Sequence, residues 1–188
     1  MHVIYLHGFC SSSKSLKAEQ VQHYVENHSE HSLFLVDLPH APINAMALIE
    51  SHISALNGKP WGLMGSSLGG YYATYLSEKY QTKAVLINPA VKAYSLLQPL
   101  LGENKNYHNG EVFELTEEHL LQLKMLYVQT ITDPKLFLLL TQTGDEVLNY
   151  KDGVNYYEHA EQRVIEGGHH GFDGFEHFLD DSFKHLAG

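Results

Sequence analysis

One stretch of the chain, Gly65-Ser66-Ser67-Leu68-Gly69, decides the fold, and it stands between an apolar run, Trp61–Met64, and a helical pattern, Tyr71–Tyr80. A Gly-x-Ser-x-Gly motif in this context predicts a sharp turn from strand to helix that lifts one serine hydroxyl clear of a sheet. Ser67 is the only serine that fits, because centring the motif on Ser66 would require glycines in place of Met64 and Leu68. Ser67 is therefore the candidate nucleophile.

The composition predicts one folded domain that spans residues 1–188. The chain is 44% hydrophobic and 18% charged, which excludes disorder and allows a sizeable core. The net charge is −10, and no cluster of Lys and Arg offers a surface for a phosphate backbone or an anionic lipid. We therefore expect neither a nucleic-acid partner nor insertion into a membrane, while the oligomeric state stays open.

The first residues and the cysteine content predict a cytoplasmic location. Met1–Leu6 has the pattern of a core strand, with no charged region, apolar region or cleavage site of a leader before it. The apolar runs are too short to cross a bilayer. Cys10 is the only cysteine, so no internal disulfide can form, which fits a reducing compartment.

Short apolar runs alternate with longer helical patterns along the rest of the chain. The predicted strands are His2–Leu6, Leu33–Leu38, Trp61–Met64, Ala84–Asn88, Leu136–Gln142 and Gln162–Glu166. The predicted helices are Ser15–His28, Ile43–Leu56, Leu68–Tyr80, Tyr94–Leu101, Glu117–Tyr127, Leu148–His159 and Phe172–Leu186. This alternation predicts an α/β fold with three layers, in which a doubly wound, mostly parallel sheet of about six strands binds ligands beyond its carboxyl edge.

The segment from Pro89 to Pro134 interrupts the alternation. It joins two predicted strands by a connection much longer than a usual crossover, and it holds two helical patterns and a polar loop, Gly102–Gly110. Long connections of this kind are typical of lids and binding loops, although a long crossover that only covers the sheet would have the same pattern. We predict a small lid-like insertion at residues 89–134.

Partners for Ser67 follow two later strands. A serine needs a base, and that base needs a group to orient it. The strand Leu136–Gln142 runs into a turn that holds Asp145, and the strand Gln162–Glu166 runs into a glycine-rich loop that holds His169 and His170. The order serine, acid, histidine is the one that accompanies this strand-to-helix turn. The carboxyl ends of parallel strands would bring these side chains together at one edge.

Other acidic residues fit this pattern less well than Asp145. Asp133 precedes its strand and lies at the wrong end of the sheet, and Asp37 precedes the serine in the chain. Glu146 is adjacent and would be able to substitute, but the turn favours Asp145. Of the two histidines, the position two residues after the glycines selects His170.

The loop after the first strand, Leu6-His7-Gly8-Phe9, supplies a fourth piece. A His-Gly-x loop at this place provides the second N–H of an oxyanion hole. We expect the backbone N–H groups of Phe9 and Leu68 to bind a tetrahedral intermediate, each contributing on the order of 3 kcal/mol to its stability. His7 would hold the loop. Cys10 is either a small buried filler or a reactive thiol.

No motif indicates a metal or a cofactor. The chain contains no His-Glu-x-x-His, no Cys-x-x-Cys, no Gly-x-Gly-x-x-Gly after a strand and no phosphate-binding Walker loop. We therefore expect catalysis that uses the chain's own side chains.

Several blocks resemble small bacterial α/β-hydrolases of the YqiA type. The matching blocks are Tyr5-Leu6-His7-Gly8-Phe9, Ser11-Ser12, Gly65–Thr74, Asn88-Pro89-Ala90-Val91, Gln142–Leu148, Val164–Gly168, His170, Phe172 and Gly174-Phe175-Glu176. The resemblance implies an α/β-hydrolase fold with a reduced sheet and esterase activity on acyl esters, including acyl-CoA thioesters. It marks Ser67, Asp145 and His170 as a catalytic triad. The family tends to have Asn where His169 and Cys10 stand.

These observations together predict a serine esterase that acts on small acyl esters or thioesters through an acyl-enzyme. A non-catalytic binding protein on a hydrolase shell and a small peptidase are the alternatives. The leucines of the insertion would either line an acyl slot or pack on the sheet, and their helical spacing fits both.

Overall fold

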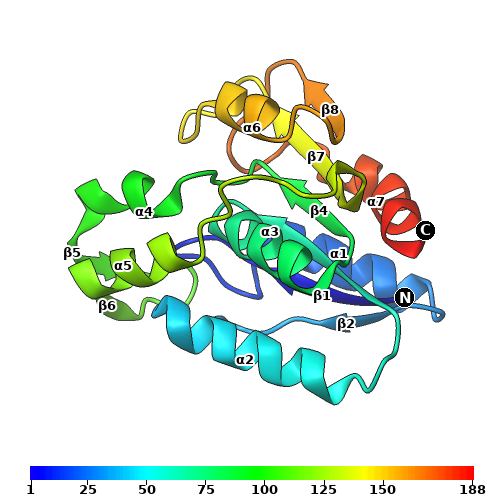
Figure 1. Ribbon diagram of the computed structural model, residues 1–188, viewed down its shortest axis with the longest axis horizontal. Helices are drawn as coiled ribbons and strands as arrows, with labels where there is room; N and C mark the ends of the chain where they lie inside the picture. The colour runs from blue at the N-terminus through cyan, green and yellow to red at the C-terminus, as the bar shows by residue number, and fades with distance from the viewer.

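Six parallel strands form the centre of the computed structural model, which describes residues 1–188 (Figure 1). Across the sheet the order is β2 (Ser32–Phe34), β1 (His2–Leu6), β3 (Trp61–Ser66), β4 (Ala84–Ile87), β7 (Phe137–Gln142) and β8 (Glu161–Ile165). Every neighbouring pair in this sheet is parallel. The predicted parallel sheet and its number of strands are confirmed.

Helices cover both faces of the sheet. On one face lie α1 (Leu16–Asn27) and α7 (Leu179–Ala187), and on the other lie α2 (Pro42–Ala55), α3 (Leu68–Tyr80) and α6 (Tyr150–Tyr156). Successive strand residues point to opposite faces. In β1, Val3 and Tyr5 therefore enter the core beneath α1 and α7, while Ile4 and Leu6 enter the core beneath α3.

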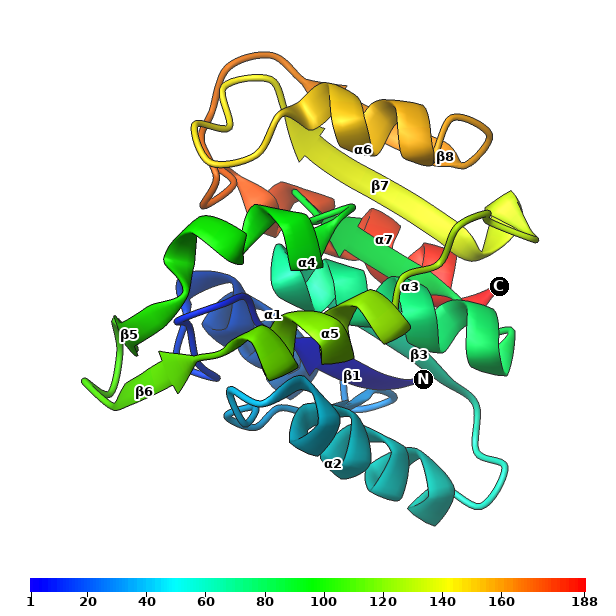
Figure 2. The same ribbon diagram turned by 60° about the vertical axis from the view of Figure 1, so that its left-hand side comes forward.

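The strand order reverses at β1, which creates the crevice where ligands bind in such sheets. From β1 the chain first moves outward to β2 and then returns to β3 on the other side of β1. Because Leu6 pairs with Gly65, the loop after β1 and the turn after β3 lie side by side at the carboxyl edge. Both chain termini lie at the opposite end of the molecule (Figures 1 and 2).

The connection between β4 and β7 forms a structured insertion beyond the carboxyl edge (Figure 2). It contains α4 (Ala93–Leu96), η1 (Gln98–Leu100), β5 (Gly102–Lys105), β6 (Val112–Leu115), α5 (Glu117–Met125) and η2 (Pro134–Leu136). The polar loop predicted at 102–110 is instead part of an antiparallel hairpin. Contacts with the loop after β1 hold its tip: the Tyr107 N–H donates to the Cys10 carbonyl at 3.0 Å, and Asn106 Nδ2 donates to the Ser11 carbonyl at 2.8 Å.

Several helices are shorter than their sequence patterns predict. Pro99 breaks the pattern at 94–101 into α4 and η1, since a proline suits the start of a helix rather than its interior. The Asn149 side chain accepts the Lys151 N–H, so α6 begins at Tyr150. The last pattern starts as a short 3₁₀ turn, η3 (Phe175–Phe178), before α7. The longest helix, α2, has 14 residues, and none of the helices could span a bilayer.

Candidate active site

Ser67 occupies a strained turn between β3 and α3. Its φ of 55° and ψ of −119° are rare for a residue with a side chain, and such geometry persists only where neighbours enforce it. Two hydrogen bonds to the β4 side do so: the Ser67 N–H donates to the Ile87 carbonyl at 3.0 Å, and the Ser67 carbonyl accepts the Ala90 N–H at 3.1 Å. The turn presents the hydroxyl at the carboxyl edge of the sheet.

The two glycines of the motif allow the chain to approach itself closely at this turn. A Cβ on Gly65 would lie 2.3 Å from the Gly69 carbonyl oxygen, and a Cβ on Gly69 would lie 1.9 Å from the Leu6 carbonyl oxygen. Both distances are far below van der Waals contact. A side chain at either position would therefore displace the backbone that positions Ser67.

The structure brings Ser67, His170 and Asp145 together in one hydrogen-bonded row. His170 Nε2 lies 3.0 Å from Ser67 Oγ, and His170 Nδ1 lies 2.8 Å from Asp145 Oδ2. The first distance falls within the range that proton transfer from serine to histidine requires, and the second is that of a hydrogen bond which orients the ring. Since Nδ1 faces a carboxylate, it carries the proton and leaves Nε2 free to accept one from Ser67.

The Asp145 carboxylate is buried, with 1% of its side chain exposed, and it is fully engaged. Its Oδ1 accepts the N–H groups of Val147 and Leu148 at 2.9 and 2.8 Å. Burial alone would raise the pKa of Asp145, but the hydrogen bonds from His170, Leu148 and Val147 together outweigh burial and lower it. The group therefore stays charged and fixes the orientation of the His170 ring.

His169 points away from this row. Its Nε2 pairs with Asp173 Oδ1 at 2.8 Å, and its Nδ1 accepts the Gly171 N–H at 2.8 Å. More than half of the His169 side chain is exposed, 54% against 22% for His170. Of the two neighbouring histidines, the geometry places only His170 between Ser67 and a carboxylate.

Two buried amide side chains hold the loop that carries His170. At the end of β4, Asn88 Nδ2 donates to the carbonyls of His169 and His170 at 3.2 and 3.1 Å. At the end of β7, Gln142 Oε1 accepts the N–H groups of His169 and Asp173 at 3.2 and 2.9 Å. The sheet thus fixes the loop through its own strand ends.

The sequence motifs predict no role for Asn88 or Gln142. A usable signal exists, since each is a single amide side chain at the end of an otherwise apolar run. Buried amides require hydrogen-bond partners, and at a strand end those partners are the neighbouring loops.

Lys17 from α1 supports the same loop from the other side. Its Nζ donates to the Gly171 carbonyl at 2.7 Å. Burial lowers the pKa of Lys17 to about 8, and the charge of Asp145 partly opposes the lowering. The Glu146 carboxylate, which the sequence left as a substitute acid, instead accepts the backbone N–H of His170 at 3.0 Å.

Two backbone N–H groups beside Ser67 are the ones expected to bind an oxyanion. Leu68 is the first residue of α3, so its N–H precedes the first intrahelical hydrogen bond, and the Phe9 N–H has no partner within the chain. Gly8 lets this loop approach closely, because a Cβ at that position would lie 3.1 Å from the Ser67 Cβ.

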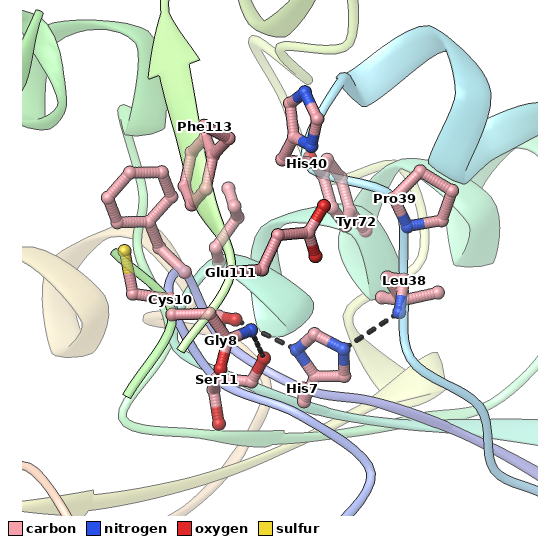
Figure 3. Close-up of a pocket in the computed structure, with 13 residues that line it drawn as sticks. His7, Gly8, Cys10, Ser11, Leu38, Pro39, His40, Tyr72, Glu111 and Phe113 are labelled. Carbon is pink, nitrogen blue, oxygen red and sulfur yellow. Dashed lines mark hydrogen bonds between the residues drawn. The ribbon is translucent and has the colours of Figure 1, made fainter. Parts of the chain in front are cut away.

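The His7 ring holds the loop that carries Phe9 (Figure 3). Nε2 accepts the Leu38 N–H at 2.9 Å, so Nδ1 carries the proton and donates to the Gly8 carbonyl at 2.9 Å. Burial lowers the pKa of His7, which keeps the ring neutral. The ring therefore ties the loop after β1 to the segment after β2.

The remaining sequence candidates lie outside the row. The Asp133 carboxylate caps η2 by accepting the Lys135 N–H at 3.0 Å, and the Asp37 carboxylate accepts the Ser13 N–H at 2.7 Å. Cys10 is buried, and burial raises the pKa of its thiol. Of the two interpretations of Cys10, the structure favours the buried filler.

A slot of about 260 Å³ opens directly above Ser67. Both Ser67 and His170 line it, and ten of its twelve lining residues are hydrophobic. The insertion contributes Leu96, Leu97 and Leu100, whereas Leu120 and Leu123 of α5 are buried in the core. Leucines of α4, η1 and the residue between them thus line the slot, whereas Leu120 and Leu123 of α5 pack in the core.

Known proteins match this chain in family and in fold. A model of the Uncharacterised protein family (UPF0227) matches residues 2–187. Est1E from Butyrivibrio proteoclasticus is similar at a TM-score of 0.72 and 16% identity, over 100% of this chain and 88% of that one. Alpha/beta hydrolase domain-containing protein 10 from mouse is similar at a TM-score of 0.74 and 17% identity, over 99% and 89% of the two chains.

A third solved structure has a similar architecture. The monoacylglycerol lipase of Paleococcus ferrophilus is similar at a TM-score of 0.72 and 17% identity, over 98% of this chain and 94% of that one. At such identities the likeness concerns the fold. The predicted α/β-hydrolase fold is confirmed.

Proposed function

The chain belongs to the UPF0227 family, whose YqiA-type members its motifs resemble, and we propose that it is a serine hydrolase of acyl esters or acyl thioesters. The observation that carries the proposal is the row Ser67–His170–Asp145 at the floor of an apolar slot. Relatives of the same fold named esterase and monoacylglycerol lipase support this reaction class.

The first half of the proposed reaction forms an acyl-enzyme. Ser67 Oγ attacks the carbonyl carbon of the ester while His170 Nε2 takes the hydroxyl proton. The carbonyl electron pair moves onto the oxygen, and the N–H groups of Phe9 and Leu68 stabilise that oxyanion. When the carbonyl re-forms, the bond to the leaving alcohol or thiol breaks, and His170 gives its proton to the departing atom.

The second half releases the acid. A water molecule gives a proton to His170 Nε2 and attacks the acyl carbon, and a second tetrahedral intermediate forms. Its collapse breaks the bond to Ser67 Oγ, which regains the proton from His170. Asp145 remains ionised throughout, since its lowered pKa favours the carboxylate that stabilises the imidazolium. The scheme needs no metal or cofactor.

The apolar slot suits a linear acyl chain. Ten hydrophobic residues line it, and burial of each methylene group of an acyl chain against them would contribute about 0.8 kcal/mol. We propose that residues 89–134 act as a lid-like insertion of a single domain, because they supply the leucines of the slot. A cytoplasmic site of action is part of the proposal and rests on the single, buried Cys10.

Labelling with a fluorophosphonate tests the proposal without knowledge of the substrate. The reagent reacts with a serine only where a base and an oxyanion hole activate it. We expect one adduct per chain, mapped to Ser67 by mass spectrometry, and hydrolysis of p-nitrophenyl esters of short fatty acids. A folded protein that neither reacts with the probe nor turns over any ester would support the binding-protein alternative instead.

A further inference from the structure

A groove of about 500 Å³ adjoins the slot, and we propose that it binds the leaving group of the substrate, an uncharged alcohol rich in hydroxyl groups such as glycerol. This inference rests on the proposed hydrolysis at Ser67. The groove and the slot share Ala90, Leu96 and Leu148 as walls, so one ligand is able to occupy both.

The position of the oxyanion donors selects this groove. In the tetrahedral intermediate the oxygen points toward the N–H groups of Phe9 and Leu68, and the other two substituents extend away from them. Another hollow, of about 240 Å³, lies between the loop after β1 and the hairpin residues Glu111 and Phe113 (Figure 3). The only walls that it shares with the slot are Phe9 and Leu68, so a substituent that extends away from these donors does not enter it.

One wall of the groove, Leu148, adjoins the residues that orient the proton donor. The leaving oxygen must take its proton from His170 Nε2. Leu148, which separates the slot from the groove, follows the turn that orients His170, and its N–H donates to the Asp145 carboxylate at 2.8 Å. An alcohol protonated by His170 therefore departs past Leu148 into the groove.

The groove differs from the slot in polarity. Four polar side chains face it and form neither hydrogen bonds nor ion pairs with the rest of the chain through their polar ends: Lys92, Ser95, Asp152 and Asn155. Ammonium, hydroxyl, carboxylate and amide groups together offer both donors and acceptors, which is what hydroxyl groups require. The apolar slot then receives the acyl chain and the groove receives the alcohol.

The charge of the groove disfavours a coenzyme A thioester. Lys92 is its single cation, and Asp152 opposes it. Lys105 and Lys124, the other lysines of the insertion, do not line it. The net charge of the chain, −10, adds no attraction for the phosphates of coenzyme A. A neutral polyol matches the balanced groove.

Three substrates with the same hexanoyl group test the inference: the methyl ester, the glycerol monoester and the coenzyme A thioester. We expect kcat/KM for the glycerol ester to exceed that for the methyl ester by about three- to tenfold. One or two added hydrogen bonds between the glycerol hydroxyl groups and the groove would produce an increase of this size. We also expect KM for the coenzyme A thioester to be no lower than for the methyl ester.

A double variant, Asp152→Ala with Asn155→Ala, should reduce the ratio of glycerol-ester to methyl-ester kcat/KM to about one. Asp181→Ala is the matched control, because it removes an exposed carboxylate from α7 on the other face of the sheet, and it should keep the ratio. Any of three results would overturn the inference. The first is a wild-type ratio of glycerol-ester to methyl-ester kcat/KM of about one, and the second is a ratio that the double variant leaves unchanged. The third is a higher kcat/KM for the coenzyme A thioester than for the glycerol ester. If the fluorophosphonate still labels Ser67 in these proteins, such a result contradicts the alcohol site but not the proposed hydrolysis. If neither labelling nor turnover is seen, the proposed hydrolysis and the alcohol site are both contradicted.

Discussion

Two regions of the molecule meet at the Ser67 hydroxyl and differ in how they are held. One consists of the loops that follow β3, β7 and β8, and the other is the insertion at residues 89–134. The loops are tied to the sheet by buried polar contacts, among them those of Asn88 and Gln142. The insertion instead exposes apolar side chains, and Leu96 and Leu100 on the slot are 42% and 46% exposed. If the proposed function holds, we expect the chemistry to depend on the buried contacts of these loops and substrate choice to depend on the exposed apolar side chains of the insertion.

Removal of the nucleophile should have the largest effect. Ser67→Ala is expected to lower kcat by about 10⁴- to 10⁶-fold, because the acyl-enzyme is unable to form. The fold should persist, since alanine is smaller than serine and the turn rests on backbone contacts. Steady-state kinetics on an activated ester, together with circular dichroism, measures both. Residual activity near that of the wild type would mean that another residue is the nucleophile and that the loops after β3, β7 and β8 do not carry the chemistry.

Loss of a loop support should have an intermediate effect. Gln142→Leu removes the acceptor of the His169 and Asp173 N–H groups, so the loop with His170 should shift, and misplacement of about 1 Å costs on the order of 10²-fold in rate. We expect kcat to fall by about 10- to 100-fold with a lower Tm, because buried donors lose their partner. KM should change little.

A surface amide offers the matched control for this variant. Gln22→Leu replaces an exposed glutamine of α1 that hydrogen-bonds only to Glu26. It should leave kcat within about twofold, as surface substitutions usually do. If Gln142→Leu behaved like Gln22→Leu, the loops would not depend on the sheet as proposed.

A change in the insertion should alter selectivity rather than chemistry. Leu97→Trp should fill part of the slot and lower the ratio of hexanoyl to acetyl ester kcat/KM by about tenfold, since each excluded methylene costs on this order. Leu121→Trp is the control, because Leu121 is exposed on α5 and does not line the slot. A uniform loss on both esters would mean that the insertion serves stability and not substrate choice.

The smallest effect is a dependence of stability on pH. The folded-state pKa of Asp145 is lowered from its ordinary value of 3.8, so its stabilising contribution is present above that value and is lost as the pH falls through the folded pKa. The Tm of the wild type should exceed that of Asp145→Asn at about pH 7, and the gap should narrow below about pH 4. Thermal scans of both proteins across this range measure the gap. A constant gap would show that the carboxylate is not preferentially held in its charged form.

The difference between the loops and the insertion also explains which parts of the structure can be predicted from the sequence. The strands and the order of Ser67, Asp145 and His170 follow from apolar runs and from motifs at their ends, and both are local signals. The hairpin at 102–115 is not local, because its polar strands are positioned by carbonyls of Cys10 and Ser11 far away in the chain.

The leucines of the insertion show the same limit. Leu97 and Leu120 both belong to apolar patterns at helical spacing. Leu97 nevertheless lines the slot, whereas Leu120 packs in the core. Helical spacing reports that a face is apolar, and only tertiary structure decides what the face meets.

The most direct test of the central claim compares the two neighbouring histidines. The second-order rate of fluorophosphonate labelling at Ser67 would be measured in the wild type, in His169→Ala and in His170→Ala. The account predicts that His169→Ala labels within about threefold of the wild type, whereas His170→Ala labels at least about 10³-fold more slowly because Ser67 has lost its base. Equal labelling of His170→Ala and wild type, or a selective loss in His169→Ala, would contradict the proposed row of Ser67, His170 and Asp145.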